Sequence, residues 1–208
     1  MTERMTVAEF LASRATRKTL NDLVFASIRQ SSMDVRAEYE GGTLSRVTIR
    51  LSGTIANIPA MKNRKLPGLN IPNIETIAKL RAMSTLWIDW QVKSKQQPAF
   101  GLADVFCLVL CGHRGKRSFD ADNCGTTISD WLEPRYKPVG KREKTERGWG
   151  IGLVANDRQV TTLAAHARSF GIETKDSIVI VERMDQTRRW LPRSLQEFGY
   201  LESYQEVA

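Results

Sequence analysis

Apolar residues recur along this chain with two different periods. Helical spacing runs from residue 10 to about residue 30 and again over 74–93, which predicts helices in both segments, the second being the longest. Alternation over 47–51 and apolar stretches at 100–110 and 177–181 predict three strands, the second of them buried on both faces. A shorter helical pattern covers 123–132. The segments 59–68 and 133–150 contain proline, glycine and many cations, which is typical of loops.

These elements predict an α/β (α+β) fold with one main domain. The pair Gly41–Gly42 interrupts the pattern and marks a boundary between a helical N-terminal extension, residues 1–44, and a domain at 45–184. Residues 185–208 form a C-terminal tail, which we expect either to pack back as a short helix or to contact a partner subunit. A chain of 208 residues suits a single domain with appendages of this kind.

The charge balance favours an anionic partner. The chain has 31 Lys and Arg against 23 Asp and Glu, a net charge of +8. Because no apolar run approaches the roughly 18–20 residues of a membrane span and no signal peptide opens the chain, we expect a cytoplasmic protein that binds nucleic acid. The candidate phosphate-binding cations are Lys62, Arg64, Lys116, Arg117, Lys141, Arg142 and Lys144. Exposed polar loops without a ligand are the alternative for each cluster.

The three cysteines, Cys107, Cys111 and Cys124, are odd in number and form no C-x-x-C pair. We expect them to be reduced and to pack as small apolar side chains. The two histidines, His113 and His166, have no zinc-ligand spacing to these cysteines or to each other. A zinc site is therefore not expected.

A pair of carboxylates, Asp120 and Asp122, stands between the apolar strand and the short helix. If the backbone is extended there, residues two apart project to the same side. Two convergent carboxylates among many cations are suited to holding Mg²⁺ against a phosphate. The alternative is that Asp122 or Asn123 caps the helix and that the acids pair with Arg114 or Arg117. A second acid, Asp157 in the segment 156–160, makes us favour the metal site.

The order of these motifs resembles the RusA family of Holliday junction resolvases. Asp120-Ala121-Asp122-Asn123 matches the family's D-x-D-N, and Asn156-Asp157-Arg158-Gln159 matches its D-D-x-Q-like segment. The resemblance covers roughly residues 45–183 and includes the long helix, the apolar strand and the closing strand. It implies a small mixed sheet flanked by helices. The family is often encoded by phages and prophages.

The resemblance implies a Mg²⁺- or Mn²⁺-dependent endonuclease that acts as a homodimer on four-way DNA junctions in recombination and repair. Asp120, Asp122 and Asp157 would be the catalytic, metal-binding acids. The family's functional lysine, four residues after the second Asp, is Thr126 here, and its second downstream acid is Asn156. The alternatives are a non-catalytic protein that binds branched DNA with the same fold, and a structural phage protein whose charge serves assembly.

Overall fold

We describe a computed structural model of the chain. It describes residues 14–58, 74–112, 121–139, 143–146, 148–184 and 192–197. Its centre is a five-stranded sheet with the strand order β1-β2-β7-β3-β6. The strands are β1 (Ser31–Glu40), β2 (Thr43–Gly53), β3 (Val105–Cys111), β6 (Val160–His166) and β7 (Ser177–Arg183). Only β3 and β6 pair in parallel, so the sheet is mixed, as the sequence predicts.

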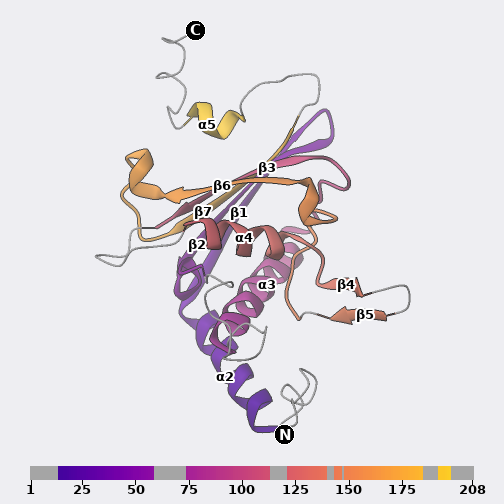
Figure 1. Ribbon diagram of the computed structural model, residues 1–208, viewed down its shortest axis with the longest axis vertical. Helices are drawn as coiled ribbons and strands as arrows, with labels where there is room; N and C mark the ends of the chain where they lie inside the picture. The colour runs from indigo at the N-terminus through magenta and orange to yellow at the C-terminus, as the bar shows by residue number, and fades with distance from the viewer. Residues whose placement is uncertain are drawn as a thin grey trace, which may run out of the picture.

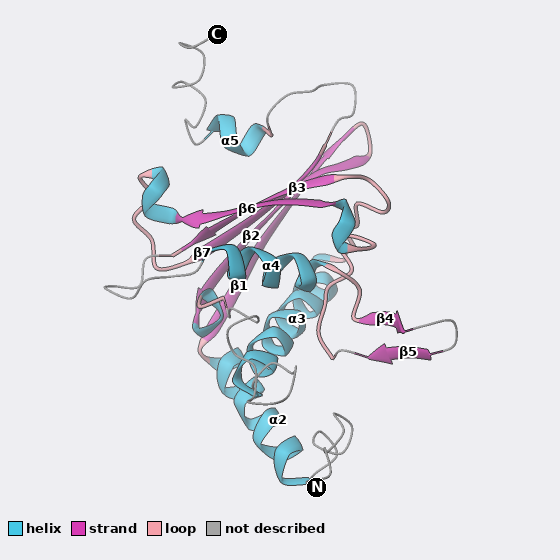
Figure 2. Ribbon diagram, viewed as in Figure 1, coloured by secondary structure: helices cyan, strands magenta, loops and turns pink. Residues whose placement is uncertain are grey.

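Helices cover the sheet unequally (Figure 1). On one side lie α2 (Arg14–Arg29), α3 (Ile74–Ser94) and α4 (Ala121–Leu132), while the short α5 (Arg193–Glu197) lies on the other. A two-stranded ribbon, β4 (Tyr136–Val139) and β5 (Glu143–Glu146), projects from the main body (Figure 2). Three short 3-10 turns, Thr54–Ala56, Asp157–Gln159 and Ala167–Phe170, complete the described elements. No helix in these residues is both long and apolar enough to cross a membrane.

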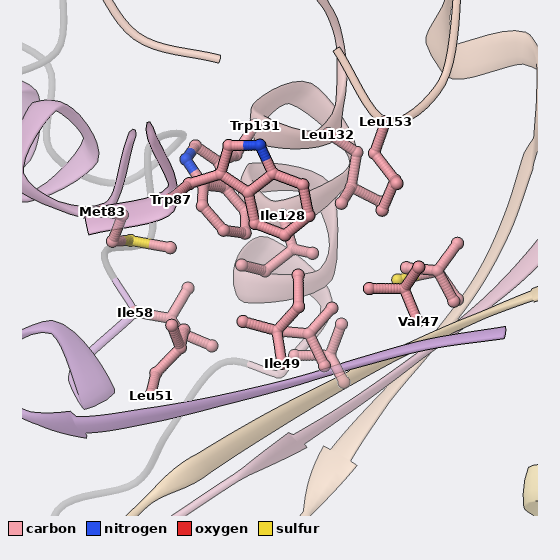
Figure 3. Packing of buried hydrophobic residues seen from close by; sticks show 14 of the residues in the cluster. Val47, Ile49, Leu51, Ile58, Met83, Trp87, Ile128, Trp131, Leu132 and Leu153 are labelled. Atoms are coloured by element: carbon pink, nitrogen blue, oxygen red, sulfur yellow. The ribbon is translucent and has the colours of Figure 1, made fainter. Parts of the chain in front are cut away.

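The main core lies between the sheet and the helices α3 and α4. Strands β2, β3 and β7 each send alternate residues into it, as the period of two requires. Figure 3 shows Trp87 and Trp131 stacked over Ile49 and its neighbours on the sheet. All seven residues of β3 are buried, because its other side chains enter a second cluster on the opposite face. Leu195 of α5 packs into this second cluster.

Several expectations from the sequence are confirmed. The long helix spans Ile74–Ser94, and its Trp87 is core, with 1% of its surface exposed. The predicted strands are β2, β3 and β7, although β3 begins at Val105 rather than residue 100. All three cysteines are buried and unpaired. The tail returns as the short helix α5.

Two other expectations are wrong, and one strand was missed. Residues 31–40, assigned to a helical extension, form β1, which pairs with β2 around Gly41 and Gly42, both at positive φ. The boundary at residue 44 thus falls within a hairpin. The segment 133–150, expected to be a loop, contains the β4–β5 ribbon. Strand β6 was not predicted, because its small and polar residues give no apolar alternation.

Candidate functional site

A cavity of about 360 Å³ lies where α4 crosses the edge strand β6. Most of its polar lining consists of oxygen-bearing side chains from three parts of the chain. The lining residues are Gly125, Thr126, Ser129 and Asp130 of α4, Thr162 and Ala164 of β6, and Asp157 from the turn before β6. We refer to this cavity as the α4–β6 groove. Of the acids predicted from the sequence, Asp157 lines it directly.

The close approach of α4 to β6 depends on a glycine. A Cβ atom at Gly125 would lie 2.9 Å from the Cβ of Ala164 and 3.2 Å from the Cγ2 of Thr162, so the helix and the strand are nearly in backbone contact there. One turn further along, the hydroxyls of Ser129 and Thr162 are 3.1 Å apart and share a hydrogen bond. These contacts fix one wall of the groove against the other.

Asp157 is attached to the C-terminal end of α4. The backbone N–H groups of Leu153 and Val154 both donate to the carbonyl of Leu132, at 2.9 and 3.2 Å. The N–H of Asp157 itself donates to the Oε1 of Glu133, at 3.0 Å. The first two bonds satisfy the carbonyl of Leu132, one of those that the end of a helix leaves without partners. They also bring Asp157, which is exposed, to the rim of the groove.

The first acidic motif lies at the other end of the same helix. Asp120 and the side chain of Asp122 are outside the described residues, whereas the backbone of Asp122 belongs to the first turn of α4. The extended geometry assumed for this pair therefore does not hold at Asp122. Its position is one turn before Thr126 and two turns, about 12 Å along the axis, before Asp130. The backbone of Asp122 thus lies one turn away from the part of α4 that lines the groove.

Helix α4 also begins earlier than the sequence predicts, at Ala121 rather than residue 123. With this start, the backbone of Asp122 and Asn123 lies inside the first turn, whereas a capping residue precedes the first helical residue. An acid in the first turn is still favoured by the helix dipole.

Most of the predicted phosphate-binding cations, Lys62, Arg64, Lys116, Arg117, Lys141 and Arg142, lie outside the described residues. The exception is Lys144, whose backbone in β5 pairs with Pro138. The chain leaves α4 after Leu132, forms the β4–β5 ribbon that contains Lys144, and returns to the end of α4 at 148–153. There the N–H of Ile151 donates to the carbonyl of Trp131 at 3.0 Å. The base of the ribbon therefore lies next to Glu133, whose side chain binds the N–H of Asp157.

The oxygen atoms of the side chains that line the groove suit a hard cation. Carboxylates and hydroxyls are the ligands that Mg²⁺ prefers, and Mg²⁺ keeps several waters, so it needs few protein ligands. Within the described part of the chain, no three His, Cys, Asp or Glu side chains form a group that could hold a metal. A metal site would therefore need a carboxylate of the Asp120–Asp122 motif together with Asp157.

Sequence reasoning missed Asp130 and Glu133. Asp130 was detectable in principle, because Asp122, Thr126 and Asp130 are spaced four residues apart and therefore share one face of a helix. Nothing in the sequence indicates that Glu133 contacts Asp157, since this contact depends on how residues 133–157 fold back.

Comparisons with known proteins add no relative. No family model matches the chain, and neither the curated proteins nor the solved structures yield a match.

Proposed function

We propose that this protein is a Mg²⁺-dependent endodeoxyribonuclease that cleaves branched DNA, with four-way junctions as the preferred substrate. The observation that carries the proposal is the position of Asp157 in the α4–β6 groove, which is also lined by the helix whose first turn contains Asp122. Asp122 is 35 residues before Asp157 in the sequence and one turn of α4 before Thr126, which lines the groove. The net charge of +8 supports an anionic substrate.

Each part of the site would have a separate task in phosphodiester hydrolysis. Asp157, with Asp120 or Asp122, would hold Mg²⁺ or Mn²⁺, which supplies charge neutralisation at the phosphate and lowers the pKa of bound water. The hydroxyls of Thr126, Ser129 and Thr162 would orient water or phosphate oxygens by hydrogen bonds. Cations of the β4–β5 ribbon and its flanks would bind the DNA backbone and thus recognise shape more than sequence.

We further propose a homodimer as the active form. Two copies related by a twofold axis would present two grooves to a junction and cut opposite strands symmetrically. This assembly rests on the resemblance to the RusA family.

A non-catalytic protein that binds branched DNA is the second candidate. One observation favours it: Thr126, at the position of the family's lysine, lines the groove and brings no positive charge to it. If a cation there is required for turnover, Thr126→Lys should increase cleavage. Binding alone would leave Thr126→Lys as inactive as the wild type.

Incubation with a synthetic four-way junction and a linear duplex of matched sequence tests the proposal. We expect paired nicks in the junction, only with Mg²⁺ or Mn²⁺, and at least a hundredfold loss in Asp122→Asn, as for removal of an essential charge stabiliser. Glu40→Gln, an exposed acid on the opposite edge strand β1, is the matched control and should cleave normally. Full activity of Asp122→Asn would refute the proposal. Tight junction binding without cleavage in either metal would support the second candidate.

A further inference from the structure

The turn that carries Asp157 is fixed by side chains to an unusual degree. Four successive backbone N–H groups, those of residues 155–158, each donate to a side-chain oxygen at 3.0 Å. The Oε1 of Gln159 accepts the first two, the Oε1 of Glu133 accepts that of Asp157, and the Oδ1 of Asn156 accepts that of Arg158. Asn156 therefore serves as a local cap for this turn.

Gln159 ties this turn to a third segment of the chain. Its side chain is buried, with 8% of the residue exposed, and its Nε2 donates to the carbonyls of Gly101 and Ala103 at 3.0 and 2.9 Å. Both amide protons and the amide oxygen are thus used. Since a carboxylate at this position would face two carbonyl oxygens, only an amide suits both sets of partners.

Glu133 makes the corresponding connection to α4. It follows the last residue of the helix and is 1% exposed. Its backbone carbonyl accepts from the N–H of Gly152 at 3.0 Å, and its carboxylate accepts from the N–H of Asp157 at the same distance. One buried residue therefore fixes both the return of the chain from the ribbon and the acid that lines the groove.

We propose that Glu133 and Gln159 are positioning residues that fix the Asp157 carboxylate for metal binding in the α4–β6 groove. This inference rests on the proposed function, in which Asp157 is a metal ligand. The two side chains accept from the backbone of residues 155–157 and connect it to two different segments, the end of α4 and the segment 101–103. Partners that orient a metal ligand typically change metal affinity by about 10–100-fold when they are removed.

The test compares Glu133→Ala with Glu133→Gln in the full-length protein. The glutamine retains an oxygen that accepts the Asp157 N–H, whereas the alanine leaves that N–H without its partner. Two quantities are measured: hydrogen exchange at the Asp157 amide by NMR, without metal or DNA, and Mn²⁺ affinity from the electron paramagnetic resonance of the free ion. Glu40→Gln controls for the loss of one negative charge.

We expect Glu133→Ala to exchange the Asp157 amide faster and to bind Mn²⁺ about 10–100-fold more weakly. Glu133→Gln and Glu40→Gln should stay close to the wild type in both measurements. Gln159→Ala removes the other side chain that holds this turn, so it replaces Glu133→Ala in the test if that protein does not fold. Unchanged exchange and Mn²⁺ affinity in the alanine variants would overturn the positioning role. Absence of Mn²⁺ binding by the wild type would instead overturn the proposed function.

Discussion

Ser84 connects three parts of the core through one hydroxyl, and its removal gives a sharp test of the packing around the site. The residue is 4% exposed in α3. Its Oγ accepts from the Nε1 of Trp131 in α4 at 3.1 Å and from the N–H of Gly150 at 2.9 Å, and it donates to the carbonyl of Leu80 at 3.0 Å. Gly150 lies just beyond the β4–β5 ribbon, so this hydroxyl also anchors the base of the ribbon.

In Ser84→Ala, two buried N–H groups lose their acceptor. Each buried donor left without a partner costs about 1–3 kcal/mol, so we expect a loss of about 2–6 kcal/mol in the free energy of unfolding. The carbonyl of Leu80 keeps its backbone bond within the helix and adds nothing to this sum. Since small domains are stable by only about 5–15 kcal/mol, the loss is a large fraction of the total.

Urea denaturation followed by tryptophan fluorescence measures the change, with Thr85→Ala as the matched control. Thr85 makes the same side-chain bond to a carbonyl four residues earlier, that of Arg81 at 2.9 Å, but it is exposed. The control should stay within about 0.5 kcal/mol of the wild type, as is usual for surface substitutions. If Ser84→Ala were no less stable than Thr85→Ala, the assignment of Ser84 as the junction of α3, α4 and the ribbon would be refuted.

Three further predictions concern separate parts of the fold. Burial raises the pKa of the Cys107 thiol to about 12, so this thiol should not react with a thiol reagent at pH 8 until the protein is unfolded in guanidinium. Reaction of Cys107 in the native protein would contradict this prediction. Gly125→Val should lower the melting temperature and separate α4 from β6, because its Cβ would already lie 2.9 Å from that of Ala164; an unchanged melting temperature would contradict the close packing. The hydrogen bond from Arg46 lowers the pKa of Glu197 from its usual 4.5. This contact therefore stabilises α5 above about pH 4.5, and the stabilisation is lost as the pH falls through the lowered pKa of Glu197 in the folded protein. The protection of the α5 amides, relative to the intrinsic exchange rate at each pH, should therefore fall on acidification in the wild type. Glu197→Gln should reduce that dependence, and equal pH dependence of protection in both proteins would contradict the assignment.

The Arg46 contact belongs to a buried network that sequence patterns could not indicate. Arg46 is 9% exposed on β2 and makes two hydrogen bonds to Glu197, at 2.9 and 2.8 Å. Glu182 of β7 accepts from the N–H and the hydroxyl of Ser194 at the start of α5. These partners are up to 151 residues apart in the sequence, and only the folded sheet brings them together.

The sequence predicts the strongly apolar elements well. Strands β2, β3 and β7 and helix α3 have unbroken apolar patterns because they form the core, and burial imposes those patterns. Strand β1 lacks such an apolar pattern, because it lies at the edge of the sheet and its surface-facing residues are charged. Strand β6, also at an edge, is rich in Thr and Ala, and the small side chains of Thr162 and Ala164 let α4 approach.

For the candidate site, the sequence identified the two acidic motifs but not their arrangement. Spacing alone suggested an extended backbone at Asp122, whereas the local residues favour a helix that starts at Ala121. The contact between Glu133 and Asp157 depends on the fold of the ribbon between them, so no local signal reveals it. Asp130 enters the groove because α4 lies across β6, which is a consequence of tertiary packing.

The central claim is that one divalent cation is held between the first turn of α4 and Asp157. Replacing Mg²⁺ with Fe²⁺ and adding ascorbate and peroxide cleaves a protein backbone close to the bound metal, and mass spectrometry locates the cuts. We expect cuts near residues 120–123 and 155–158 in the same preparation, suppressed by excess Mg²⁺ and absent in Asp157→Asn. Cuts at only one of these segments, or at neither, would contradict a shared metal site in the α4–β6 groove.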